Sequence, residues 1–144
     1  MKRLAVLVVA GLVLAGCGAS MHTSTSGNTA AAQAQIKSAY EKFFSGKTSV
    51  ADRVAVLQNG PQFKGLVTSF AANPLAKNVN VTVSSVTLKG QDKARVVYTV
   101  KLGGVGLPKQ TGTAVLQNGS WKVGDASLCK LVALQGSTPS VCKS

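Results

Sequence analysis

The sequence predicts an α+β domain in which three N-terminal helices pack on a curved four-stranded antiparallel sheet, followed by a short C-terminal helix. Apolar residues recur at helical spacing between Ala30 and Ala72. From Val79 they alternate with a period of two, as in half-buried strands. Asn118-Gly119 separates two short alternating runs and marks a tight hairpin.

The first residues have the three-part plan of a secretory leader. Lys2 and Arg3 precede the apolar run Leu4–Leu14, which is shorter than the roughly 20 residues of a membrane span. The segment Leu14-Ala15-Gly16-Cys17 resembles a bacterial lipobox, in which the thiol carries a lipid with fatty acids such as palmitate. We expect removal of residues 1–16 and anchoring through Cys17 at the outer face of the cell membrane. An ordinary signal peptide with a chance cysteine is the alternative.

Residues 17–29 consist mainly of Gly, Ala, Ser, Thr and Asn, with too little apolar surface to fold. We expect them to form a flexible tether between the bilayer and a single domain over residues 30–144. His22, the one histidine of the chain, lies in this tether and is therefore not expected to be catalytic.

Three helices are expected before the sheet. The apolar face of the first comprises Ile36, Tyr40, Phe43 and Phe44. The second begins at a capping box formed by Ser49 and Asp52 and ends at Asn59-Gly60. The third runs from Pro61 to Asn73-Pro74, and its apolar face comprises Phe63, Leu66, Val67 and Phe70.

The strand pattern changes phase once. One set of apolar residues has odd numbers and the next has even numbers; they are Val79, Val81 and Val83, then Val86 and Leu88. Either both faces of this strand are covered or, as we favour, a bulge near Ser84-Ser85 resets the phase. The following strand alternates from Ala94 to Leu102, and pairing Leu88 with Ala94 requires a longer turn over 89–93.

The last hairpin has a register fixed by its two-residue turn. Its expected apolar face comprises Ala114, Leu116, Trp121 and Val123, and the tryptophan there is interpreted as core rather than as a ligand platform. Gly103–Pro108 lacks the ending of a phosphate loop and is expected to be a flexible connection. Asp125 is expected to cap a final helix carrying Leu128, Leu131 and Val132.

Two cysteines remain once Cys17 is assigned to lipid. Cys129 and Cys142 form an even pair in an oxidising compartment, so we expect a disulfide that ties the C-terminal tail to the last helix. They are too few for a zinc site, and no metal or other cofactor is expected.

The chain is strongly basic, with 16 Lys and Arg against 4 Asp and Glu. Without Lys2 and Arg3, 14 − 4 leaves a charge of +10. These charges are dispersed, which is typical of a solvated surface but also favours attraction to anionic envelope components. The absence of a basic stripe interleaved with aromatic residues argues against nucleic acid.

Two segments resemble the mycobacterial low-molecular-weight secreted antigen family, in its C-terminal domain: Ser49–Gly60 and Gly112–Cys129. The likeness extends from about Ala31 to Cys142 and implies an exported, immunogenic, non-enzymatic protein. Free secretion, known in that family, conflicts with Cys17 in a lipobox. The predicted layers also resemble the nuclear-transport-factor-2-like (NTF2-like), or cystatin-like, cone.

We therefore expect a membrane-anchored lipoprotein with a non-catalytic binding or display domain. The alternative is a carrier or sensor of an apolar ligand held between helices and sheet. Candidate residues for that pocket, or for an ordinary core, are Phe43, Phe63, Phe70, Tyr98 and Trp121. An enzyme is least favoured, because Tyr98 has no evident acidic or basic partner.

Overall fold

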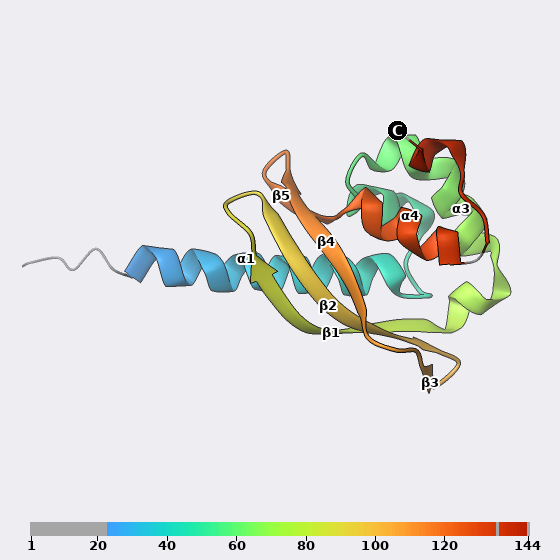
Figure 1. Cartoon of the computed structure of the whole chain (residues 1–144), viewed down its shortest axis with the longest axis horizontal. Helices are drawn as coiled ribbons and strands as arrows, with labels where there is room; N and C mark the ends of the chain where they lie inside the picture. Colours follow the sequence, from blue (N-terminus) through green and yellow to red (C-terminus); the bar gives the residue numbers. More distant parts are fainter. Residues whose placement is uncertain (1–22, 135, 144) are drawn as a thin grey trace, which may run out of the picture.

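The structure, a computed structural model, describes residues 23–134 and 136–143. Helix α1 (Thr23–Phe44) runs along a curled antiparallel sheet, and the shorter helices gather around its C-terminal end (Figure 1). The sheet has the order β1-β2-β4-β5, and α1 packs against both edge strands. These strands are β1 (Val79–Leu88), β2 (Lys93–Leu102), β4 (Gln110–Gln117) and β5 (Ser120–Val123). The predicted α+β plan is confirmed.

Helix α1 begins earlier than the sequence pattern indicates. We expected helix from Ala30 and a flexible tether before it, but residues 23–29 already belong to α1. Once a helix is nucleated, each added residue gains a hydrogen bond at the cost of ordering one residue, so a helix can continue into polar sequence. The predicted apolar face is confirmed, because Ile36, Tyr40, Phe43 and Phe44 are all buried.

The second and third helices are shorter than predicted. Helix α2 (Val50–Ala55) starts at the expected cap, where the Asp52 amide donates to Ser49 Oγ at 3.1 Å. It ends well before the expected Asn59, which adopts a left-handed conformation with φ 52°. A 3₁₀ turn, η1 (Gly60–Phe63), therefore precedes α3 (Lys64–Ala72). Another, η2 (Pro74–Asn78), leads into the sheet.

The change of phase in β1 is a bulge, as favoured. Val83 pairs with Tyr98 and Ser85 pairs with Val97, so one residue of β1 is left without a partner. The ladder then continues to the predicted pair of Leu88 with Ala94. The bulge places both apolar sets of β1 on one face of the sheet.

The predicted register of the last hairpin is confirmed, with Leu116 opposite Trp121 and Ala114 opposite Val123. Leu116 is nevertheless 36% exposed, so it does not share the burial of the other three residues of that face. Gly103-Gly104, expected in a flexible connection, instead turns the chain into a two-residue strand, β3 (Val105–Gly106), which pairs with β2.

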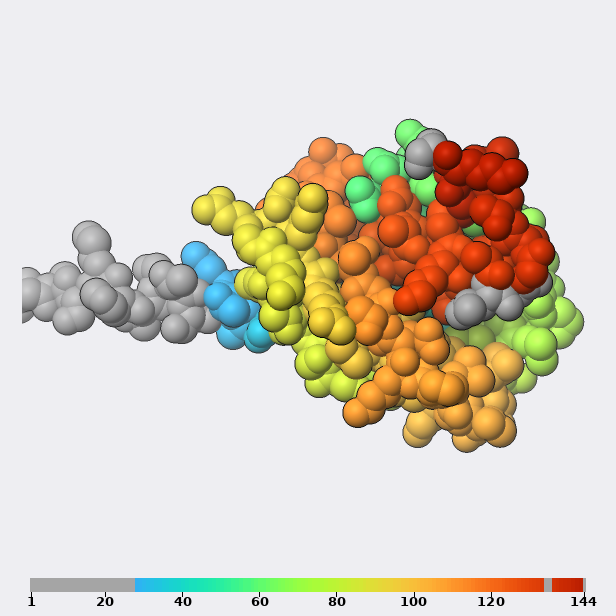
Figure 2. Space-filling model, in the orientation of Figure 1, coloured from blue at the N-terminus to red at the C-terminus, as the bar shows by residue number. Residues whose placement is uncertain are grey.

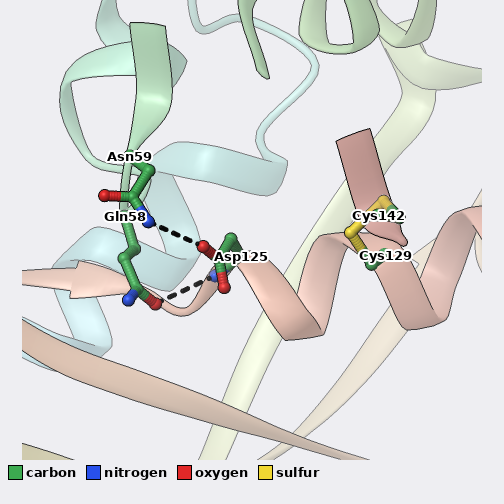
Figure 3. Close-up of a disulfide and its surroundings, with 5 residues drawn as sticks. All are labelled: Gln58, Asn59, Asp125, Cys129 and Cys142. Atoms are coloured by element: carbon green, nitrogen blue, oxygen red, sulfur yellow. Dashed lines mark hydrogen bonds between the residues drawn. A yellow bond between two sulfur atoms is a disulfide. The ribbon is translucent and has the colours of Figure 1, made fainter. Parts of the chain in front are cut away.

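The C-terminal elements are joined as predicted. Helix α4 (Asp125–Leu134) is linked to η3 (Ser140–Cys142) by the Cys129–Cys142 disulfide, with 5.5 Å between the Cα atoms (Figure 3). Asp125 lies at the start of α4 but accepts a hydrogen bond from the side-chain amide of Asn59 at 2.9 Å. The carboxylate thus connects α4 to the segment after α2, a role different from the expected helix cap.

Candidate functional site

An apolar cavity of about 170 Å³ lies at the end of the molecule where α1 finishes. Its floor comes from Phe44 of α1 and from β1 and β2, whose pleat directs Val79, Val100 and Leu102 toward the helices. The other walls come from α3, η2, α4 and the segment after β3, and comprise Phe70, Asn73, Leu75, Ala76, Leu107, Gln110 and Leu131.

Among the described residues, no charged side chain lines this cavity, and the two polar residues in its wall are amides. Asn73 Oδ1 accepts the backbone N–H of Leu75 at 3.0 Å, and Gln110 Nε2 donates to the carbonyl of Pro108 at 3.0 Å. These bonds hold the amides at the wall without supplying an acid or a base. An uncharged, apolar ligand segment is the chemistry that such a lining accommodates.

The disulfide lies on a helix that contributes one residue to the cavity wall. Leu131, in its wall, lies on α4 two residues after Cys129, and the bond to Cys142 fastens the following tail to that helix. Pinning the tail restricts the unfolded chain and thereby stabilises the folded one.

Of the five predicted pocket or core residues, Phe70 alone lines this cavity. Phe43, Phe63 and Tyr98 lie in the core with 1%, 4% and 2% of their surface exposed. Trp121 is 9% exposed and packs in the same core from β5. The wall residues that sequence reasoning missed are mostly ordinary strand and loop apolar residues, whose spacing alone does not distinguish a cavity from a filled core.

Tyr98 belongs to an aromatic cluster in the core. Its ring stacks on Phe44 with centroids 5.6 Å apart and lies 5.1 Å from the ring of Tyr40. Burial raises the pKa of Tyr98 to about 12. A phenol with that pKa keeps its proton at neutral pH, so it is not suited to act as a general base.

Tyr40 anchors the helix to the sheet and to α4. Its hydroxyl donates to the carbonyl of Thr113 at 2.6 Å and lies 3.2 Å from Ser127 Oγ. Ser127 Oγ also accepts the Thr113 N–H at 2.8 Å. Burial raises the pKa of Tyr40 above its ordinary value, in accord with a neutral donor in a structural network.

Arg53 is a buried cation that sequence reasoning did not single out. It is 2% exposed, and its guanidinium donates to the carbonyls of Ser45 at 2.7 Å and Thr48 at 3.2 Å. Its Cζ lies 5.4 Å from the ring centroid of Phe70, a cation–π contact behind one cavity wall. Burial lowers the Arg53 pKa, and its Nη1 has no hydrogen-bond partner among the described residues.

The expected lipidation residue, Cys17, lies outside the described residues. In the part of the chain that the structure describes, no helix has the length and apolarity to cross a bilayer. Within the same residues, no three His, Cys, Asp or Glu side chains group in a way that could hold a metal ion.

The sequence matches a known protein family over most of its length. Residues 29–139 match the family described as low molecular weight antigen MTB12, C-terminal domain. Among solved structures, an NTF2-like protein from Campylobacter jejuni, provisionally named a transpeptidase, is 11% identical with a TM-score of 0.42. That alignment covers 69% of this chain and 97% of the other, and at this similarity it says nothing of the chemistry here. No curated protein matches the chain. Because the family match spans most of the sequence, the chain belongs to the family of the low molecular weight antigen MTB12, through its C-terminal domain.

Proposed function

We propose that this protein is an exported, membrane-anchored, non-catalytic lipoprotein whose domain binds an apolar ligand segment in the cavity at the end of α1. The observation that carries the proposal is the cavity itself, which is lined by apolar side chains and two amides. Filling such a space with hydrocarbon removes apolar surface from water on both sides. Membership of an antigen family and a disulfide both support an extracytoplasmic location.

The size of the cavity indicates how much of a ligand it holds. At about 170 Å³ it is of the order of an engineered apolar cavity of about 150 Å³ that stays dry and takes benzene. It thus suits about six carbons of an acyl chain, and burying six methylenes contributes roughly 5 kcal/mol. Before the cost of association is subtracted, that free energy sets a limit of about 0.2 mM on the dissociation constant that the cavity alone can give. Tighter binding requires polar contacts in addition to this hydrocarbon burial, for which the amides of Asn73 and Gln110 in the cavity wall are suitable.

The test is native mass spectrometry of the protein purified from its own host, with co-purified lipid as the readout. Val100→Phe fills the cavity from its sheet side, and we expect this variant to lose the lipid that the unaltered chain retains. Val97→Phe is the matched control, because Val97 is on the same strand but its parity places it on the opposite face. A chain that carries no lipid, or lipid retained equally by Val100→Phe, contradicts the proposal.

Anchoring is tested separately through Cys17. A diacylglyceryl group supplies the two chains needed for stable membrane attachment, at about 0.8 kcal/mol for each buried methylene. We expect Cys17→Ala, expressed in the native host, to leave the membrane fraction and to lose metabolically incorporated fatty acid. If that variant still sediments with membranes as the unaltered chain does, lipid anchoring is wrong.

Pure display, without a ligand, is the other candidate function. The dispersed positive charge would then serve attraction to anionic envelope components. The cavity favours the binding function, because a display domain has no need of an unfilled apolar space.

A further inference from the structure

The most exposed large apolar side chains of the described residues gather at the mouth of the cavity. Leu75 is 60% exposed, Val105 is 68% exposed and Leu107 is 44% exposed. They come from η2, from β3 and from the segment that follows β3. Leu116, at 36%, is the remaining large exposed apolar residue in the described part, and it lies on β4 near the last hairpin.

Backbone pairing brings these three residues together. Leu75 and Leu107 both line the cavity, and Val105 is the cross-strand partner of Leu102, which also lines it. Cross-strand partners project to the same side of a sheet, so Val105 extends the apolar wall outward. The Gly103 N–H donates to the carbonyl of Asn78 at 3.2 Å, which joins the β2–β3 turn to the end of η2.

Three exposed lysines flank this apolar mouth. Lys77 follows Leu75 in η2 and Lys109 follows Leu107, while Lys101 lies in β2 opposite Gly106, on the other face of the sheet edge from Val100 and Leu102. We call these six residues the rim: Leu75, Val105 and Leu107 with Lys77, Lys101 and Lys109. In Figure 2 the residues around 100–110, in orange, form the lower right edge of the face shown, beside the light green residues around 75.

Within the described residues, no rim lysine forms an ion pair with an acid. Between residues 73 and 110 the one acid is Asp92, at the opposite end of the β1–β2 hairpin. The ion pairs that the described residues do form join Lys37 to Glu41 and Lys42 to Asp52. An apolar tip bordered by unpaired lysines is complementary to a bilayer with anionic headgroups over an apolar interior.

We propose that the rim docks on an anionic lipid bilayer, with its three apolar side chains among the acyl chains and its lysines among the headgroups. This inference rests on the proposed function and extends it, because docking places the mouth of the cavity where an acyl chain can enter. Helix α1 spans about 33 Å between its first residue and the cavity. A chain anchored at its N-terminus reaches the same bilayer with its rim when α1 lies along the membrane surface.

The experiment measures binding to phosphatidylcholine vesicles with and without phosphatidylglycerol. The chain from Gly18 onward is exported through a leader without the lipobox, so that the disulfide forms and no anchor contributes. Each variant is first shown to unfold cooperatively. We expect binding to the anionic vesicles that weakens with salt, and little binding to the neutral ones.

Two sets of variants separate the apolar and the charged parts of the rim. Val105→Ser alters the rim without touching the cavity wall, and we expect about a threefold to tenfold loss of vesicle affinity. Its matched control is Leu116→Ser, which should bind unchanged. Changing the three rim lysines to Gln should weaken binding by about tenfold or more. The same change at Lys89, Lys93 and Lys130, which alters net charge equally, should weaken it much less.

The docking proposal is overturned if anionic vesicles are not bound, or if the control variants weaken binding as much as the rim variants. It is also overturned if Val105→Ser breaks up a dimer of the chain while vesicle binding stays the same. Co-purified lipid, lost in Val100→Phe, reports the cavity independently of vesicle binding. Rim-dependent vesicle binding without any co-purified lipid would therefore uphold docking and reject the cavity ligand.

Discussion

Gly112 should be among the positions of this fold least able to accept a side chain. A Cβ built on Gly112 would lie 2.5 Å from the Tyr40 hydroxyl oxygen and 2.8 Å from Ser127 Oγ. Both distances are shorter than real Cβ contacts, so Gly112→Ala must displace the network that ties α1 to β4 and α4. Overpacking costs about 1–3 kcal/mol, and a weakened buried hydrogen bond adds about 1 kcal/mol.

We therefore expect Gly112→Ala to lower the free energy of unfolding by roughly 2–4 kcal/mol, measured by urea denaturation. Gly65→Ala is the matched control, because a Cβ there meets nothing within 4 Å on the exposed side of α3. It should be neutral or stabilise by about 0.5 kcal/mol. A double variant that combines Gly112→Ala with Tyr40→Phe tests whether the Tyr40 hydroxyl is the group that clashes. If it is, the double variant should lose less unfolding free energy than the sum of the losses in the two single variants.

The reasoning is refuted if Gly112→Ala costs less than about 0.5 kcal/mol, the usual range for surface changes. Strict additivity with Tyr40→Phe would also contradict it. In that case the close approach of Tyr40 to β4 would not be the contact that excludes a side chain at Gly112.

Two further predictions concern the tail and the capping carboxylate. Replacing both Cys129 and Cys142 by Ser should lower the free energy of unfolding by about 3 kcal/mol, which is the loop-closure contribution expected for a loop of this length. Amide exchange after α4 should also increase. Unchanged stability would contradict this. The Asp52 carboxyl has a lowered pKa, first because Ser49 Oγ donates to it at 2.8 Å and second because Lys42 lies 3.2 Å away. A carboxyl whose pKa is lower in the folded than in the unfolded state stabilises the fold at pH values above its ordinary pKa, and this contribution is lost as the pH falls through the folded-state pKa. Below about pH 4, the free energy of unfolding should therefore fall less steeply with decreasing pH in Asp52→Asn than in the unaltered chain. Equal acid dependence in the two chains would contradict this.

Local signals predicted the parts of the fold that are set by neighbouring residues. The two-residue turn at Asn118-Gly119 sets the register of the β4–β5 hairpin, because both residues adopt the positive φ angles that such a turn needs. The change of parity after Val83 indicated the bulge, since a continuous strand would have exposed one apolar set. Two cysteines remaining in an exported chain indicated the disulfide for reasons of compartment.

The cavity could not be predicted in the same way. Its wall brings together Phe44, Leu75, Val100, Leu107 and Leu131, which are far apart in the sequence and on different elements. Periodicity shows which face of an element is apolar, but whether facing side chains fill the space between them depends on three-dimensional packing.

Burial of Arg53 was missed for a related reason. Its partners are backbone carbonyls of the α1–α2 connection and the ring of Phe70, and none of these leaves a charge pattern in the sequence. The start of α1 could not be predicted either, because polar composition before Ala30 favours coil, whereas a nucleated helix can continue into polar sequence.

The most direct test of the central claim is an intermolecular nuclear Overhauser measurement on the folded protein with a medium-chain fatty acid. We expect contacts from acyl methylenes to the methyl groups of Val100, Leu102 and Leu131, and we expect the contacts to Leu102 and Leu131 to be lost in Val100→Phe but not in Val97→Phe. Saturable binding of the fatty acid without contacts to any of these methyl groups, or no binding at all, would contradict the claim that this domain holds an apolar ligand in its cavity.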